Sequence, residues 1–333
     1  MPRANAVLIL AAAAGAAAPL ARPFVLLPPE PTSSRLSLSL PREGQAGERE
    51  RASLDRGGGG APVPIVSRVV PLGVQLSGSE GAYGDELTAT VWEVEHPSRL
   101  IEAYWAAGAE DPGGSETPVG KKRSDPFGAV VWPGSMAAAA ELGARREAGS
   151  GSCGLGSVLV VGAGTGVEAQ AAALLGARQV LATDVSGLAL DLLRYGVIRA
   201  GLNDVVEVER FDMADHSRPM PGGFDLVVFA DVLYNDVLSS HVGRRVAELM
   251  LKRRRNAGSG KGCLPGVIVT DSQRFHGTDF VPTLNSELER IGGDWGGEVP
   301  LQWEERTLPS VTTSGMLVEE DQTYDVAVRI LSV

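Results

Sequence analysis

The fold is decided by one stretch of sequence, Val158-Leu159-Val160-Val161-Gly162-Ala163-Gly164-Thr165-Gly166. Ser157–Val161 is short and apolar and is rich in β-branched residues, which predicts a buried strand. The glycines that follow allow a sharp turn and leave room for a ligand beside the backbone. The apolar segment Val167–Leu175 then predicts a helix, which Gly176 ends.

The alternation of strand and helix continues downstream. It predicts a parallel sheet with helices on both faces, and the near-continuous apolar strands fit burial on both faces. The expected strands are Gln179–Thr183, Val205–Arg210, Phe224–Ala230 and Val267–Thr270, and the expected helices are Leu188–Ala200, Val237–Leu251 and Val281–Ile291.

The C-terminal part of the chain breaks this alternation. Leu301–Arg306 and Tyr324–Leu331 are two further expected strands, and the segment between them leaves no room for a helix. They therefore predict an antiparallel hairpin that closes the sheet. The resulting fold class is α/β, with a Rossmann-like sheet of seven strands that is mostly parallel.

Residues 65–126 predict an extension that precedes the main domain of residues 127–333. Val66–Leu76 and Leu87–Glu95 are expected to form a hairpin, and Arg99–Ala107 a helix. In the main domain, Phe127–Ala148 begins with a turn at Trp132-Pro133-Gly134 and continues as an alanine-rich helix.

Residues 1–64 predict a targeting presequence followed by a disordered linker. Met1–Ala21 has an early Arg3 and an apolar run at Val7–Ala18, and Phe24–Arg42 is rich in serine and arginine and poor in acids. This two-part composition resembles the plastid presequences of algae with complex plastids, which implies a plastid location. A low-complexity tail on a cytoplasmic or secretory protein is the alternative.

Charge and composition narrow the function classes. The net charge of −11 disfavours binding to a phosphate backbone. Cys153 and Cys263 make neither a disulfide framework nor a metal quartet, and the four histidines show no metal-ligand spacing, so no metal is expected. The run Val7–Ala18 is too short for a transmembrane helix, and no second candidate follows it.

A ligand site is expected at the carboxyl ends of the strands, where open parallel sheets bind their ligands. The residues there are Gly162–Gly166, Asp184, Asp212 and Asp231–Tyr234. The glycines follow a G-x-G-x-G pattern, and Val167 occupies the position where the dinucleotide pattern G-x-G-x-x-G needs glycine.

The acidic residues allow two interpretations each. Asp184 follows the second strand, where a carboxylate can accept hydrogen bonds from both ribose hydroxyls of a nucleoside, or can cap the next helix. Asp212 follows the third strand, where it can accept from an adenine amino group or can be a solvated turn residue.

Three segments together resemble the family 16 protein methyltransferases, which are mostly lysine methyltransferases. They are Val131-Trp132-Pro133-Gly134-Ser135, the glycine turn with Thr183-Asp184 behind it, and the D-x-x-Y motif Asp231-Val232-Leu233-Tyr234. The resemblance covers roughly residues 127–274. It implies a seven-stranded methyltransferase fold, S-adenosylmethionine as cofactor and a lysine of a protein as acceptor. The chain is expected to be a monomer.

The resemblance also assigns site residues. Asp231 and Tyr234 should face the acceptor. One departure is Met213, at a position where the family commonly has tryptophan; its thioether can still pack on adenine. The residues expected to bind the cofactor are Trp132, Gly162, Ala163, Gly164, Gly166, Asp184, Asp212, Met213 and Ala230.

Three other functions stay open on the residues alone. A nicotinamide-dependent oxidoreductase conflicts with Val167 and with the lack of a Tyr-x-x-x-Lys pair. A methyltransferase for a small molecule or nucleic acid is the second, although no Asn-Pro-Pro-Tyr motif follows the fourth strand. The third is a catalytically silent binding protein of the same fold.

Overall fold

The computed structural model describes residues 49–55, 61–75, 86–109, 126–148, 155–257, 266–272, 280–292, 303–313 and 322–332. These residues belong to one unit of the chain, which begins at Glu48. The expected presequence through residue 48 and both cysteines lie outside the described residues.

A seven-stranded sheet forms the centre of this unit, in the order β6-β5-β4-β7-β8-β10-β9. The five strands from β4 to β8 pair in parallel, and β10 is antiparallel to both β8 and β9. The expected fold class is therefore confirmed. The strands are β4 (Ser157–Val161), β5 (Gln179–Asp184), β6 (Val206–Arg210), β7 (Leu226–Ala230), β8 (Gly266–Asp271), β9 (Glu304–Thr313) and β10 (Gln322–Ser332).

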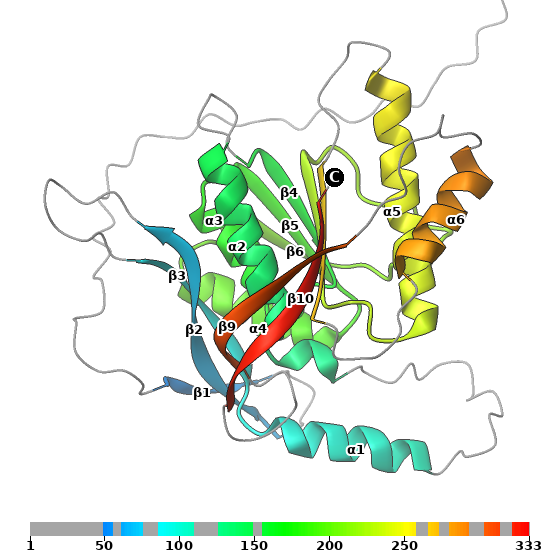
Figure 1. The fold of residues 1–333 in the computed structure, drawn as a ribbon. Coiled ribbons are helices and arrows are strands. Elements are labelled where there is room, and N and C mark those ends of the chain that lie inside the picture. Colours follow the sequence, from blue (N-terminus) through cyan, green and yellow to red (C-terminus); the bar gives the residue numbers. More distant parts are fainter. Residues whose placement is uncertain are drawn as a thin grey trace, which may run out of the picture. The chain divides into compact units, whose positions relative to one another are not determined.

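Helices cover both faces of the sheet, as expected (Figure 1). Alternate residues of β4 point to opposite faces, so Val158 and Val160 join one core cluster whereas Leu159 and Val161 join another. The first cluster includes residues of α2 (Pro133–Ala148), α3 (Val167–Leu174) and α4 (Gly187–Arg199). The second includes residues of α5 (Asp236–Ala257) and α6 (Phe280–Gly292).

The C-terminal hairpin is longer than the sequence indicated. A strand was expected at Leu301–Arg306, and β9 instead runs from Glu304 to Thr313. The pairing of β9 with β10 shifts between Tyr324 and Val326, next to Pro309, which has no backbone N–H to donate. Pro309 therefore interrupts the ladder without ending the strand.

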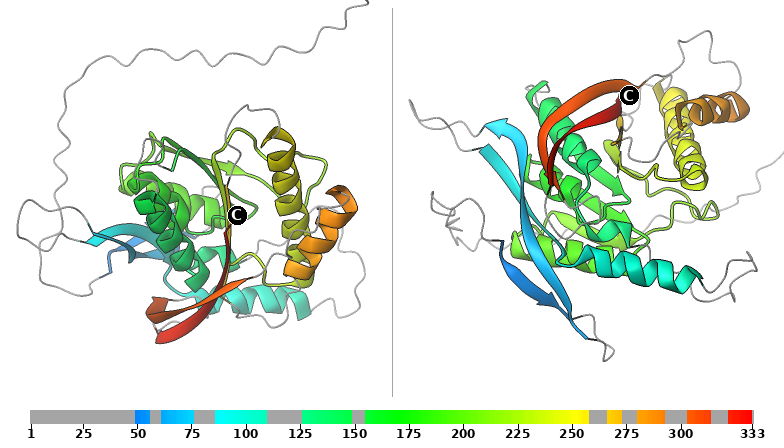
Figure 2. Two further views of the ribbon diagram at one scale, coloured as in Figure 1. Left: turned by 45° about the horizontal axis from the view of Figure 1, so that its top comes forward. Right: turned by 60° about the horizontal axis from the view of Figure 1, so that its bottom comes forward.

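A second, three-stranded antiparallel sheet precedes the main domain. The expected hairpin is present as β2 (Val63–Gln75) and β3 (Glu86–Val94), and α1 (Pro97–Ala109) follows it. This sheet packs against the helices on one face of the central sheet, because its residues Val70, Leu72 and Val91 join the same buried cluster as α2, α3 and α4. Figure 2 shows the sheet in blue beside the green helices.

One strand in this sheet corrects the sequence analysis. Residues 42–64 were expected to be linker, but Arg51–Leu54 forms β1 and pairs with β2. Leu54 is buried in a core cluster with Ile65 and Trp92. Charged residues and glycines surround this segment, so its sequence does not predict a strand. It forms one because it pairs with the edge of β2.

A buried ion pair connects the small sheet to the main domain. Glu93 on β3 is fully buried and accepts a hydrogen bond from Arg68 Nε on β2 at 2.8 Å. Its other carboxyl oxygen accepts from the backbone N–H of Val131 at 3.1 Å. A buried carboxylate needs such partners, and the second of them fixes the segment that leads into α2.

Two glycines with left-handed backbone offer a test of the packing between α3 and α4. Gly166 has φ 88° and Gly176 has φ 91°. A Cβ on Gly166 would lie 2.8 Å from Leu193 Cγ on α4, whereas a Cβ on Gly176 would meet nothing within 4 Å.

We expect Gly176→Ala to lower the free energy of unfolding by about 1–2 kcal/mol, the cost of a left-handed side chain. Gly166→Ala should lower it further, because the new methyl group also displaces Leu193. Urea unfolding measures both values. Equal losses in the two variants would contradict the close contact between the glycine turn and α4.

Candidate active site

A pocket opens at the carboxyl ends of the central strands, where β4 lies between β5 and β7. The chain order reverses here, and sheets of this kind bind ligands at such a switch point. Ten of the eleven residues singled out from the sequence line this pocket, and Gly166 does not. The ten are Trp132, Gly162, Ala163, Gly164, Asp184, Asp212, Met213, Ala230, Asp231 and Tyr234.

The glycine turn forms the floor of this pocket. The backbone N–H groups of Gly162 and Ala163 both donate to the carbonyl of Thr183 at 2.9 Å, which fixes the turn against β5. Gly162 has φ 72°, and a Cβ there would lie 2.5 Å from Val232 Cγ1. Only glycine therefore fits between the turn and the segment after β7.

Gly166 lies apart from the other residues predicted for the cofactor site. It precedes α3 as the N-cap residue and packs against Leu193, away from the pocket lining. Its position in the motif is explained by the entry into α3, and nothing places it beside a ligand.

Asp184 links the turn to the next helix. Its two carboxyl oxygens accept hydrogen bonds from Gly164 N at 2.9 Å and from Ser186 N at 2.8 Å. The N-cap residue of α4 is Ser186 and not Asp184. Each carboxyl oxygen has a further lone pair, so Asp184 can hold the turn and still accept from a ligand hydroxyl.

Asp212 and Met213 lie on the loop after β6. Asp212 lines the pocket and also accepts from Ala214 N at 3.0 Å, so both interpretations made from the sequence fit its position. Met213 lines the pocket together with Phe211, an aromatic residue two positions earlier that the sequence analysis did not select. Although Met213 stands where the family commonly has tryptophan, the same loop still brings an aromatic ring, that of Phe211, to the pocket.

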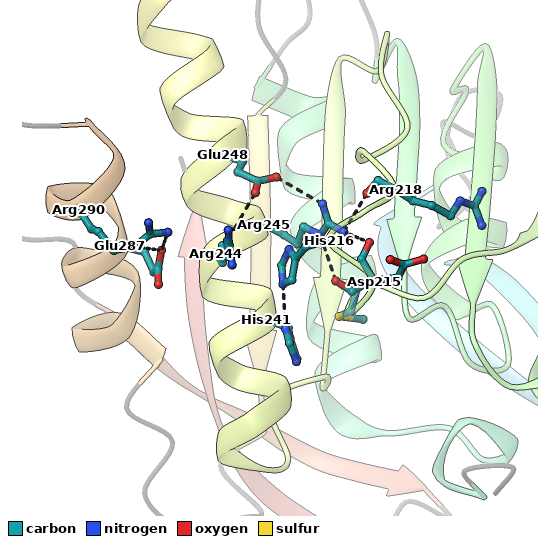
Figure 3. Close-up of polar contacts among 10 residues, drawn as sticks. Asp215, His216, Arg218, His241, Arg244, Arg245, Glu248, Glu287 and Arg290 are labelled. Atoms are coloured by element: carbon teal, nitrogen blue, oxygen red, sulfur yellow. Dashed lines mark hydrogen bonds and ion pairs between the residues drawn. The ribbon is translucent and has the colours of Figure 1, made fainter. Parts of the chain in front are cut away.

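Arg245 on α5 holds this loop in place and was also missed from the sequence. Its side chain is 1% exposed. The guanidinium donates to three backbone carbonyls of the loop, those of Met213 at 3.0 Å, Asp215 at 2.7 Å and Arg218 at 3.0 Å. Figure 3 shows Arg245 in a polar cluster beside the hydrogen-bonded rings of His216 and His241.

Asp231 occupies a strained and enclosed position. It has φ 50°, and no other non-glycine residue in the described part of the chain has positive φ. Its carboxyl oxygens accept from Gly134 N at 2.5 Å and from Ser272 N at 2.7 Å. Asp231 therefore fixes the start of α2 and the end of β8, and backbone strain of this kind gathers at functional sites.

Gly134 is the partner that makes this arrangement possible. A Cβ on Gly134 would lie 2.4 Å from the carboxyl carbon of Asp231. The Gly134 carbonyl in turn accepts from the Thr270 hydroxyl at 2.8 Å. The Trp-Pro-Gly turn is thus bound to the ends of both β7 and β8.

Aromatic rings form one side of the pocket. Phe127 contacts Tyr234 with ring centroids 5.4 Å apart and Trp132 with centroids 6.3 Å apart. The Trp132 indole N–H donates to the Phe127 carbonyl at 2.7 Å. Phe127 was not among the expected site residues, although it is the first residue of the range that the resemblance covers.

Glu168 is a buried carboxyl group behind the pocket. It lies in the first turn of α3 and is 1% exposed, and neither of its oxygens has a hydrogen-bond partner of normal geometry among the described residues. Burial raises the pKa of Glu168 to about 7; the Ser135 hydroxyl opposes this shift, and the nearby carboxylates Asp231 and Asp184 add to it. The sequence placed Glu168 in an apolar helix and gave no sign of a role.

The described residues contain no group of three or more His, Cys, Asp or Glu side chains that could hold a metal ion. No helix in the same ranges is both long enough and apolar enough to cross a membrane.

The strand order, the antiparallel hairpin and a glycine-lined pocket at the switch point define the class of the seven-stranded methyltransferases. Within that class, residues 118–254 match the family model described as lysine methyltransferase. The match agrees with the resemblance of the tryptophan segment, the glycine turn and the D-x-x-Y motif to that family.

Two curated relatives share part of the chain. The electron transfer flavoprotein beta subunit lysine methyltransferases of Rattus norvegicus and Mus musculus are 32% and 31% identical over 116 residues. The match covers 35% of this chain and 42% of each relative, so it spans less than half of the length of these proteins.

Solved structures with a similar fold include a putative RNA methyltransferase from Pyrococcus horikoshii. Its TM-score is 0.40 at 16% identity, and the alignment covers 70% of this chain and 98% of that one. An O-methyltransferase from Bacillus cereus has a TM-score of 0.34 at 16% identity, with 71% and 91% covered. Neither comparison bears on the acceptor.

The residues around the pocket fit S-adenosylmethionine, the cofactor that the family implies. Gly162 and Gly164 line the pocket without side chains, and the Asp184 carboxylate, an acceptor suited to ribose hydroxyls, lines it as well. Phe211 and Met213 offer an apolar surface for the adenine ring.

We expect Asp184→Ala to weaken S-adenosylmethionine binding, because each hydrogen bond to a charged acceptor contributes roughly 1.5–3 kcal/mol. The variant should also unfold at a lower temperature, since Gly164 and Ser186 lose their acceptor. Calorimetric titration measures the affinity, and a thermal melt measures the stability. A folded variant with unchanged affinity would show that Asp184 only supports the turn.

Proposed function

We propose that this chain is an S-adenosylmethionine-dependent methyltransferase that transfers a methyl group to a lysine side chain of a protein. One observation carries the proposal: the glycine turn, Asp184 and the D-x-x-Y motif line a single pocket. The cofactor residues and the acceptor residues thus face the same space, as transfer between two bound molecules requires.

The choice of a protein lysine as acceptor rests on the family and on the pocket. The matched family is described by lysine methylation, and the two relatives are named for a lysine of a protein subunit. Phe127, Trp132 and Tyr234 give the pocket an aromatic side. Aromatic faces attract cationic side chains, and they also pack against the apolar stem of lysine.

The bound cofactor supplies an electrophilic methyl group on a positively charged sulfur. The protein must present the lysine amine to it without the extra proton, and the reference pKa of lysine is about 10.4. Entry into a pocket with an aromatic side lowers that pKa through desolvation. Asp231 then accepts a hydrogen bond from the amine and orients its lone pair, and Tyr234 excludes water from the same space.

The hydrogen bonds of Asp231 suit this role. Backbone donors to both oxygens hold its carboxylate in one orientation at the pocket. Ala230, the residue before it, also lines the pocket and has a small side chain that leaves space for the cofactor.

Asp231→Asn is the sharpest test of the proposal. Asparagine keeps the size of aspartate and tolerates positive φ. Its single amide oxygen can accept from Gly134 N or from Ser272 N but not from both, so a thermal melt is needed to check that the variant is folded. We expect S-adenosylmethionine affinity within a few-fold of wild type and a fall in turnover of about a hundredfold or more, the scale that misplacing a reacting group costs. Calorimetric titration and tritiated methyl transfer to a proteome extract, with protease and nuclease controls, measure the two quantities.

Three results of this test would count against the proposal. Loss of binding and turnover together would make Asp231 a structural or cofactor residue. Unchanged turnover would make the D-x-x-Y resemblance accidental. Transfer that survives protease but not nuclease would move the acceptor from protein to nucleic acid.

We further propose that the residues before Glu50 act as a plastid-targeting presequence. The support is their composition, with an apolar run and then a serine- and arginine-rich segment. Glu50 itself belongs to the folded unit, since its backbone N–H donates to Ser67 Oγ at 2.9 Å. Mass spectrometry of native protein should find an N-terminus upstream of Glu50 and downstream of Ala21; an intact Met1–Ala21 segment would refute the presequence.

A further inference from the structure

We propose that Glu168 is the buried counter-charge for the cationic methionyl end of S-adenosylmethionine. This inference rests on the proposed function, because it takes the pocket to hold that cofactor. It adds a residue that lies behind the pocket lining and outside the motifs used so far.

Glu168 lies close to the pocket although it is not part of the pocket lining. α3 begins at Val167, directly after the glycine turn that forms the pocket floor, so Glu168 lies in the turn of helix beneath that floor. Three residues that line the pocket act on its carboxyl group, namely Ser135, Asp184 and Asp231. They come from α2, from the end of β5 and from the end of β7, so the carboxyl group is close to the pocket from several sides.

The three carboxyl groups differ in their hydrogen bonds. Asp184 and Asp231 each accept backbone N–H donors on both carboxyl oxygens. Glu168 is equally enclosed and accepts none of normal geometry among the described residues. A buried carboxylate without partners is costly. Gln170, the other buried polar residue of α3, lies beside Gly196 of α4, whereas the groups that act on Glu168 line the pocket.

The charge of the cofactor suits a buried carboxylate. The methionyl end of S-adenosylmethionine bears a sulfonium, an ammonium and one carboxylate, and it therefore has a net positive charge. In a low-dielectric site a cation close to a carboxylate favours its ionised form. Two charged groups face Glu168, and both are acidic: Asp184 and Asp231. In the free protein they favour the protonated form of Glu168.

A proton release on binding follows from this arrangement. With its pKa near 7, Glu168 holds about half a proton at pH 7 in the free protein. Binding of the cation lowers that pKa, and the proton leaves the carboxyl group for solvent. Binding should therefore weaken as the pH falls below about 7, because the cofactor must then displace a proton.

The test is calorimetric titration of the full chain with S-adenosylmethionine in buffers of different ionisation enthalpy, between pH 6 and pH 9. We expect wild type to release about half a proton more per cofactor bound than Glu168→Gln at pH 7, and the two proteins to differ little at pH 9. The difference between them cancels the proton that the cofactor's own amino group, with a reference pKa of about 8, takes up on binding as an ammonium. Glu168→Gln lacks the carboxyl group that titrates. It should bind about tenfold more weakly than wild type at pH 8 and within about threefold at pH 6, where wild-type Glu168 is itself protonated.

Glu207→Gln is the matched control, because it makes the same change at an exposed position on β6. It should release as many protons as wild type. Glu168→Gln should fold, since it removes a buried charge and keeps the side-chain shape. If it does not, the wild-type titration decides alone.

Two outcomes would overturn the inference about Glu168. One is cofactor binding by wild type without proton release at pH 7, and the other is the same release in Glu168→Gln. Failure of wild type to bind S-adenosylmethionine at any pH is a separate result, since it would refute the proposed function itself.

Discussion

The two hydrogen bonds that Asp231 accepts are the interaction on which the site depends. They join the backbone of Gly134, at the start of α2, to the backbone of Ser272, after β8. Because α2 begins there, the same bonds place Trp132 and Ser135 on the pocket side, and the Thr270 hydroxyl strengthens the join through the Gly134 carbonyl. Asp231, which we propose orients the lysine amine, is therefore also a structural residue. For this reason Asp231→Asn, which keeps the side-chain shape, is more informative than removal of the side chain.

The repeating part of the fold could be predicted from sequence because its determinants are local. Each strand from β4 to β8 is an apolar run, and the residues that follow it, such as Asp184 and Asp231, lie where parallel strands end. Gly166 shares the motif, but its surroundings are Leu193 of α4 and not the pocket lining. A glycine in such a motif can be required for contact with a ligand or for packing of the chain, and the spacing of the motif does not distinguish the two.

Other parts of the site could not be predicted because their roles arise from contacts across the chain. Arg245 is one arginine in a basic helix, and only the fold brings it to the carbonyls of Met213 and Asp215. Glu168 stood in an apolar helix with no sign of a role, and only the fold shows that it is buried. Strand β1 has no apolar pattern of its own and exists because β2 offers it an edge.

The range of these contacts has a consequence for how the protein acquires its pocket. The Asp231–Gly134 bond joins residues 97 apart in the sequence, and the hydrogen bond from the Thr313 hydroxyl to the Val131 carbonyl joins residues 182 apart. Contacts of such separation form late, because long loops must close first. During synthesis the glycine turn and its helix can form early, while the segment bearing Trp132 has no fixed place until the C-terminal hairpin has been made. The nascent chain thus passes through a stage with an ordered βα unit and an unfinished binding site.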